Sequence, residues 1–224
     1  MKRTVLDHIP LSFDWSEMAR SCHLDAGSQE GEALLLKLRE SSGLIEPKAI
    51  YGRVQVRGVF DGRILLEDGS CLESRLLAKK LICAGRIFPY LITIGPRLEE
   101  RVGKLGSSNL LESWVLDKLG TYALRLIRQK VQERIEKEVG AKVSKFSPGS
   151  TSYWDIKQQE VLFHLLFARP QDPQEFGVTL TQNYLMIPKK SVSGIMGKTE
   201  REFVECEICP RQCEERRKPY QGCD

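Results

Sequence analysis

The amino-acid sequence predicts an α+β fold in a single domain, and three stretches carry that prediction. Apolar residues recur at helical spacing over residues 109–139, and residues 87–95 form a near-continuous apolar run typical of a central strand. Residues 54–67 favour a hairpin of two strands around an Asp-Gly turn. The predicted order is helix, hairpin, strand, long helix, loop, helix and strand, which is that of an α+β domain.

The first third of the chain is predicted to hold a helix followed by the hairpin. Residues 29–42 have the pattern of an amphipathic helix, and Gly43 is expected to end it. Residues 54–57 alternate valine with polar side chains, which is strand periodicity. The Asp-Gly pair at 61–62 then forms the turn, and residues 64–67 return as the second strand.

The longest predicted element is a helix that begins after Asn109 and ends at about Val139. Asn109 with Glu112 three residues later is a capping pattern, and Gly140 is expected to end the helix. At 1.5 Å per residue the helix is on the order of 45 Å long. A shorter helix over residues 96–105 precedes it. The apolar stripe of the long helix is assigned to the hydrophobic core rather than to a cofactor site.

Residues 145–198 contain the pattern that favours a binding site. A Ser-Pro-Gly turn at 147–149 and a Ser-Val-Ser-Gly turn at 191–194 bracket a predicted helix over 155–167 and a predicted strand over 178–187. Glycine lets a backbone approach a ligand closely, and proline holds the approach rigid. Two such loops on regular elements predict a concave site. On spacing alone, an ordinary turn is the favoured interpretation of each.

Composition and charge exclude several classes of function. The 224 residues carry a net charge of +4 with acids and bases interspersed, so nucleic-acid binding is not expected. No apolar stretch approaches the length of a membrane-spanning helix, and Lys2 and Arg3 are not followed by the apolar segment of a signal peptide. Seven cysteines, four of them within residues 206–223, fit a reducing compartment, so the expected location is cytoplasmic.

Beyond spacing, the sequence resembles the activation domain of cobalamin-dependent methionine synthase. That family carries, in order, an Arg-Pro-x-Pro-Gly-Tyr loop, a Trp-containing helix, a Gly-x-x-Leu-Thr strand and a Pro-x-x-Ser-Val-Ser-Gly turn. Here the order is Lys-Phe-Ser-Pro-Gly-Ser at 145–150, Trp154, Gly-Val-Thr-Leu-Thr at 177–181 and Pro-Lys-Lys-Ser-Val-Ser-Gly at 188–194. The resemblance covers residues 1–200 and implies a mostly antiparallel twisted sheet with long helices.

The resemblance implies that the chain binds S-adenosylmethionine. Lys145 stands where the family has the arginine that binds the ligand carboxylate, so the charge is kept and the bidentate geometry is lost. Asp14, in a Phe-Asp-Trp sequence near the start, stands where the family has an aspartate that contacts the ligand. Asp14 is equally expected to cap a short helix. The residues expected at the ligand are Asp14, Lys145, Ser147, Pro148, Gly149, Ser150, Ser191, Ser193 and Gly194.

In this family the domain presents the methyl group of S-adenosylmethionine to cobalamin. The chain has neither the Asp-x-His-x-x-Gly motif that supplies a histidine to cobalt nor a Rossmann-type Gly-x-Gly-x-Gly turn. Cobalamin is therefore expected on a partner, either a corrinoid protein or other modules of methionine synthase. Reductive methylation, which reactivates oxidised cobalamin, then needs an electron donor such as ferredoxin or flavodoxin. The alternative is a non-catalytic docking module that binds and gates a corrinoid protein.

Residues 201–224 form a Cys-rich tail that departs from the family pattern and is predicted to bind a metal. The spacing of Cys206, Cys209, Cys213 and Cys223 lets thiolates two and three residues apart reach one metal. An iron–sulfur cluster is the first interpretation, because reactivating cobalamin needs an electron. Structural zinc has the same Cys-x-x-Cys signature. The third interpretation is a charged, disordered tail that holds metal only when its partner is present.

Overall fold

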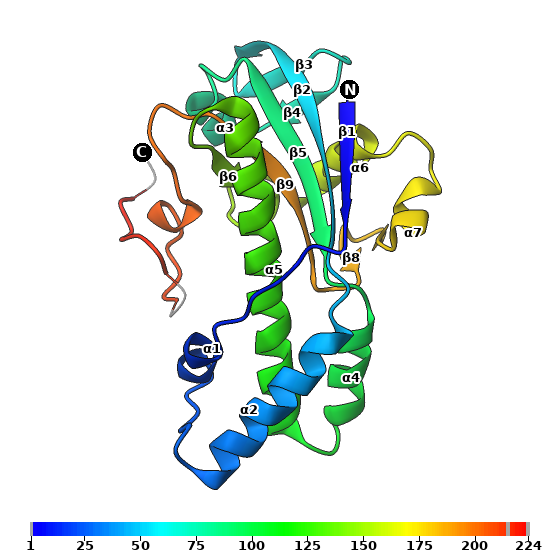
Figure 1. Cartoon of the computed structure of the whole chain (residues 1–224). Helices are drawn as coiled ribbons and strands as arrows, with labels where there is room; N and C mark the ends of the chain where they lie inside the picture. The colour runs from blue at the N-terminus through cyan, green and yellow to red at the C-terminus, as the bar shows by residue number, and fades with distance from the viewer. Residues whose placement is uncertain (1, 214–215, 223–224) are drawn as a thin grey trace.

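The structure is a computed structural model that describes residues 2–213 and 216–222, and Figure 1 shows its architecture. Its centre is a seven-stranded sheet in the order β4-β3-β2-β5-β9-β6, with β1 paired to β2. Every strand pairing among the described residues is antiparallel. Helices pack against this sheet, so the predicted α+β class with an antiparallel sheet is confirmed.

Three strands form the middle of the sheet: β2 (Lys48–Phe60), β5 (Arg86–Thr93) and β9 (Ser191–Gly197). Every residue of β5 after the first is buried, as the apolar run predicts for a central strand. The Asp-Gly pair at 61–62 has positive φ at both residues and joins β2 to β3, which confirms the predicted turn. The remaining strands are β1 (Lys2–Asp7), β3 (Arg63–Leu66), β4 (Cys71–Glu73), β6 (Ser144–Phe146), β7 (Thr179–Leu180) and β8 (Met186–Ile187).

Helix α5 (Leu110–Val139) runs along one face of the sheet and continues well beyond it (Figure 1). The Asn109 side chain accepts the N–H of Glu112 at 3.0 Å, and Gly140 ends the helix with a φ of +70°, as predicted. The apolar stripe of α5 packs in the same core cluster as buried side chains of β5 and β9. No helix in the described part of the chain is long and apolar enough to cross a membrane.

A helical region surrounds the N-terminal half of α5, below the sheet in Figure 1. It consists of α1 (Trp15–Ser21), α2 (Gln29–Ser41) and α4 (Arg97–Leu105). The opposite face of the sheet is covered by α6 (Gln159–Leu166), which packs on β2, β5 and β9. Apart from 3-10 turns, the remaining described helices are the short α3 (Arg75–Lys80) and α7 (Asp172–Phe176).

The tail leaves β9 and folds back beside α5, where it is drawn in orange and red in Figure 1. Phe203 is 2% exposed, and its ring stacks on Phe146 with the ring centroids 5.4 Å apart. Ile208 joins the same core cluster, and the 3-10 turn η3 (Glu205–Glu207) lies between these two residues. The first part of the tail is therefore anchored in the core at both ends of η3.

Three local predictions are wrong. The Ser-Val-Ser-Gly segment at 191–194 is not a turn but the start of β9, because its residues pair with β5 and Gly194 permits a close approach to Phe146. Residues 178–187 form the short hairpin β7–β8 rather than one strand, since a turn with a positive φ at Tyr184 reverses the chain. Gly43 does not end α2, because the chain continues into the 3-10 turn η1 (Ser42–Leu44).

Candidate functional site

Two adjoining cavities of about 300 and 500 Å³ lie along one side of α5, and together they are named here the α5 groove. Four residues line both cavities, which makes the groove continuous: Glu17, Arg125, Arg128 and Arg217. Side chains of α5 make up most of the lining, with α1, the loop after α5, β6, β9 and the tail contributing the rest. A cavity of this size suits a small organic ligand.

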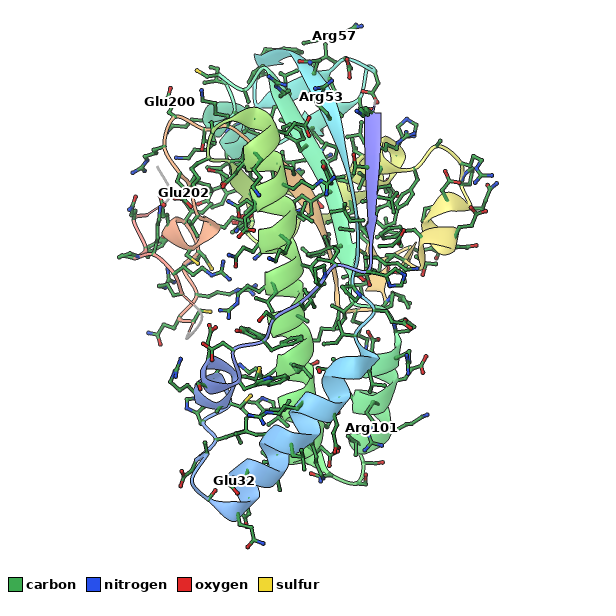
Figure 2. All side chains as sticks on the ribbon, viewed as in Figure 1. Glu32, Arg53, Arg57, Arg101, Glu200 and Glu202 are labelled. Carbon is green, nitrogen blue, oxygen red and sulfur yellow. The ribbon has the colours of Figure 1, made fainter. Side chains whose placement is uncertain are left out.

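The α5 groove carries an excess of positive charge. Its cationic side chains are Lys118, Arg125, Arg128, Lys142, Lys145 and Arg217, and its carboxylates are Glu17, Glu133 and Glu136. Arg125, Arg128 and Gln132 follow one another at helical spacing, so they lie on one face of α5. Figure 2 shows nitrogen-tipped side chains gathered on this side of the helix. Such a groove favours a ligand with an anionic group.

Lys145 is the predicted site residue that points into the α5 groove. It lies on β6, opposite Met196 of β9, and its Nζ donates to Oε1 of Gln132 at 2.6 Å. Burial, followed by the nearby charges of Arg128 and Arg217, lowers the pKa of Lys145 to about 8. The ammonium keeps further donors for a ligand, and a ligand carboxylate placed beside it would pair with its charge.

Residues 147–150, named here the serine loop, follow β6 directly and form the turn that the sequence predicts. Ser147 is buried, and its Oγ lies 3.3 Å from the hydroxyl of Tyr90. Gly149 has a φ of +74°, which glycine adopts without steric cost, and Ser150 is exposed. Pro148 fixes the backbone between them. The loop follows the strand that carries Lys145, but none of its four residues is among those that line the two cavities of the α5 groove.

A carboxylate of the tail already occupies these donors. Oε1 of Glu205 accepts the Ser147 N–H at 3.1 Å and the Ser150 hydroxyl at 2.6 Å. Burial raises the pKa of Glu205, while the two hydrogen bonds and the charges of Arg128 and Lys145 act in the opposite direction. One carboxylate of the tail therefore bonds to the serine loop and is acted on by the charges of two groove cations.

Asp14 takes the helix-capping role that the sequence allowed. Its Oδ1 accepts the N–H groups of Ser16 and Glu17 at 2.9 and 3.0 Å, and it does not line the α5 groove. The carboxylate that does line the groove is Glu17, which accepts from the Tyr122 hydroxyl at 2.8 Å and from Arg125 at 2.5 Å. These two donors hold the pKa of Glu17 below its usual value. Contact between Asp14 and a ligand stays a prediction.

Ser191 and Ser193 are not brought to the α5 groove. Both hydroxyls are buried, and they donate to Thr93 Oγ1 at 2.9 Å and to Gln159 Oε1 of α6 at 3.2 Å. Because side chains alternate along a strand, the residue between them, Val192, faces the groove. Gly194 lies against the end of β6, since a Cβ there would be 2.2 Å from the Phe146 carbonyl oxygen.

The described cysteines of the tail do not form a metal centre. Among the residues that the structure describes, no three Cys, His, Asp or Glu side chains lie close enough to hold one ion. Arg216 instead donates to the carbonyl oxygens of Cys206 and Cys209 at 2.7 and 2.9 Å, and Cys213 is exposed. Cys223 lies outside the described residues. The predicted metal site stays a prediction, which iron and zinc analysis of anaerobically purified protein tests.

Sequence reasoning missed several groove residues. Arg125, Arg128 and Gln132 form a polar stripe beside the apolar stripe of α5, and this stripe was the available signal. A polar stripe on a long helix is ordinarily solvated, so it carries little weight alone. Glu17 and Glu205 gave no signal, because each is an ordinary acidic residue whose role depends on elements far away in the chain.

No protein-family model and no curated protein matches the sequence. Among solved structures, the chain is similar to a crystal structure of the MetH reactivation domain bound to AdoHcy. The similarity covers 91% of this chain and 81% of that one, with a TM-score of 0.63 and 13% sequence identity. The chain therefore has the fold of the MetH reactivation domain. The predicted resemblance to the methionine synthase activation domain is confirmed at the level of fold.

Proposed function

We propose that this chain binds S-adenosylmethionine in the α5 groove and donates its methyl group to cobalamin on a partner protein. The observation that carries the proposal is the position of Lys145. The lysine lines a cationic groove, and the serine loop directly follows its strand along the chain, within a fold whose solved neighbour was crystallised with AdoHcy. AdoHcy is the product left when S-adenosylmethionine loses its methyl group.

The charges of the groove fit the two ends of the methionine part of this ligand. Lys145 and Arg128 supply positive charge for its carboxylate, and charge-assisted hydrogen bonds of this kind are the strong ones. Glu17 is anionic at neutral pH and supplies negative charge for the ligand ammonium or the sulfonium. Asp14, one turn before Glu17, is proposed as a second carboxylate at the ligand.

The proposed reaction is the reductive methylation of cobalamin. The partner carries cob(II)alamin, which takes one electron from a donor such as ferredoxin or flavodoxin and becomes cob(I)alamin. The cobalt electron pair then attacks the methyl carbon, so a cobalt–carbon bond forms and the carbon–sulfur bond breaks. The products are methylcobalamin and S-adenosylhomocysteine. The chain's own residues need only hold the sulfonium in line with the cobalt, which is a positioning role.

One observation favours the alternative function, a docking module that gates a corrinoid protein without using a methyl donor. Glu205 fills the donors of the serine loop, so a ligand carboxylate does not find them free. In the docking interpretation the groove is a binding surface for the partner, and the tail closes the loop permanently. Binding of the small ligand separates the two functions.

Calorimetric titration of the full chain with S-adenosylhomocysteine and with S-adenosylmethionine tests the proposal. We expect saturable binding of both ligands at one site. A second assay mixes the chain with a corrinoid protein in the cob(II) state, a low-potential reductant and S-adenosylmethionine, and follows the methylcobalamin spectrum. That spectrum should require both this chain and the methyl donor. Absence of heat and of a thermal shift at saturating ligand would count against ligand binding and favour the docking module.

A further inference from the structure

We propose that Glu205 is an internal ligand of the serine loop, and that S-adenosylmethionine binds by displacing the Glu205 carboxylate from Ser147 and Ser150. This inference rests on the proposed function and adds a competition between the tail and the ligand. The tail is thereby part of the binding site rather than a separate appendage.

The contacts of Glu205 are those of a bound carboxylate ligand. Its Oε1 takes one backbone N–H and one hydroxyl from the serine loop, at 3.1 and 2.6 Å. The charges of Arg128 and Lys145 act on the same carboxylate. A backbone donor, a hydroxyl and two cations are the partners that a free amino-acid carboxylate would recruit.

A second carboxylate cannot share this position without cost. The one N–H of Ser147 goes to Glu205, and the one hydroxyl proton of Ser150 is shared between Glu205 Oε1 at 2.6 Å and the Ser147 carbonyl oxygen at 2.7 Å. Two carboxylates in one partly buried position repel each other, and one of them then leaves or takes up a proton. The ligand therefore competes with Glu205 for the loop, and its apparent affinity falls by the fraction of molecules in which Glu205 is bound.

The surroundings of Glu205 allow it to leave without detaching the tail. Phe203 on one side and Ile208 on the other are buried in the same core cluster. Glu207 is held separately, since it accepts from Lys218 at 3.0 Å. Displacement then rearranges the single turn η3, in which Glu205 is followed directly by Cys206, whose carbonyl oxygen accepts from Arg216 at 2.7 Å. Cys206 is half-buried, so its thiol reports on that rearrangement.

The test uses the full chain with Glu205→Gln and Glu205→Ala, titrated with S-adenosylhomocysteine. Glu200→Gln is the matched control, because Glu200 is an exposed glutamate directly before the same tail, labelled in Figure 2. Both Glu205 variants should bind more tightly than the natural chain, by roughly threefold to tenfold, and the control should not change. Thermal unfolding of each variant confirms that it is folded.

A second readout follows the tail directly. Alkylation of Cys206 by iodoacetamide, mapped by mass spectrometry, should speed up when S-adenosylhomocysteine saturates the natural chain. Cys83, which is exposed on the loop after α3, serves as the internal control and should not change. In Glu205→Gln the labelling of Cys206 should already be fast without ligand.

The outcomes are distinct. Ligand binding that is unchanged or weaker in both Glu205 variants overturns the competition and makes Glu205 a residue that holds the loop in its binding shape. Labelling of Cys206 that the ligand slows or leaves unchanged overturns the displacement as well. Absence of binding to every variant, Glu205→Ala included, rejects the proposed function together with this inference.

Discussion

Two serine- and glycine-containing segments look alike in the sequence and have different roles in the structure. The serine loop, residues 147–150, is a turn whose donors reach Glu205 of the tail, directly after the strand that carries Lys145. The Ser-Val-Ser-Gly segment at 191–194 is a central strand whose hydroxyls face α6 on the other side of the sheet. Small residues permit either a tight turn or a close strand contact, and only the neighbouring elements decide between them.

The two glycines make the difference concrete. Gly149 needs its positive φ of +74° to form the turn. Gly194 has an ordinary strand backbone, and glycine is required there because any Cβ would collide with the Phe146 carbonyl oxygen, the Tyr90 hydroxyl and Ser147 Oγ. Gly194 therefore contributes to the site indirectly, because it lets β6 and the start of the serine loop pack close to β9.

Gly194→Ala is expected to have the largest effect, and the effect is on stability. The new Cβ lies 2.2 Å from a backbone oxygen, so strands must move apart, at a cost of about 3 kcal/mol. For a chain of this length that lowers the melting temperature by roughly 6–12 °C. Gly149→Ala is the matched change, since it strains a positive φ at a cost of about 1–2 kcal/mol. If the Gly194 variant melts like the natural chain, β6 and β9 do not approach so closely.

Lys145→Ala is expected to weaken S-adenosylhomocysteine binding by about tenfold to a hundredfold. The change removes a charge-assisted contact to the ligand carboxylate, which contributes roughly 1.5–3 kcal/mol. Lys142→Ala is the control, because Lys142 lines the same groove and its ammonium already pairs with Glu136 at 2.8 Å. Calorimetry measures both variants. Equal losses in the two variants would mean that the groove attracts the ligand only through its overall charge.

Much of the fold is predictable from the sequence because local chemistry decides it. The cap at Asn109, the end of α5 at Gly140 and the Asp-Gly hairpin each depend on residues within a few positions of one another. The site is less predictable, because its members come from α1, α5, β6 and the tail. Lys145 was found through a family pattern. Glu17 and Glu205 have no such pattern and meet the groove only after folding.

Binding of S-adenosylhomocysteine should weaken as the pH rises through about 8, since Lys145 loses its proton there. Above that pH, ligand binding must first restore the proton, so affinity falls by up to tenfold per pH unit. Stability should change in the opposite direction. The unfolded chain binds this proton up to its usual pKa of 10.5, so the contribution of Lys145 to stability rises with pH between about 8 and 10.5.

Lys145→Arg isolates the effect of the Lys145 proton on ligand binding, because the guanidinium stays charged throughout this pH range. Calorimetry over roughly pH 6.5 to 9.5 spans the titration of Lys145. Over this range the affinity of the arginine variant should not change with pH. A natural chain whose affinity is equally flat would show that Lys145 does not bind the ligand as a cation.

Ser193→Ala is expected to have the smallest effect, and it separates the two segments most clearly. The change removes the donor to the buried Gln159 Oε1, at 3.2 Å, which costs about 1 kcal/mol of stability and lowers the melting temperature by roughly 2–4 °C. Affinity for S-adenosylhomocysteine should not change, because the hydroxyl lies on the α6 side of the sheet. Ser150→Ala is the reverse case. The exposed Ser150 hydroxyl contacts Glu205, so removing it should alter the affinity for S-adenosylhomocysteine with little change in stability. A Ser193 variant with altered affinity and unchanged stability would mean that the strand hydroxyl reaches the ligand after all, as the sequence pattern alone suggests.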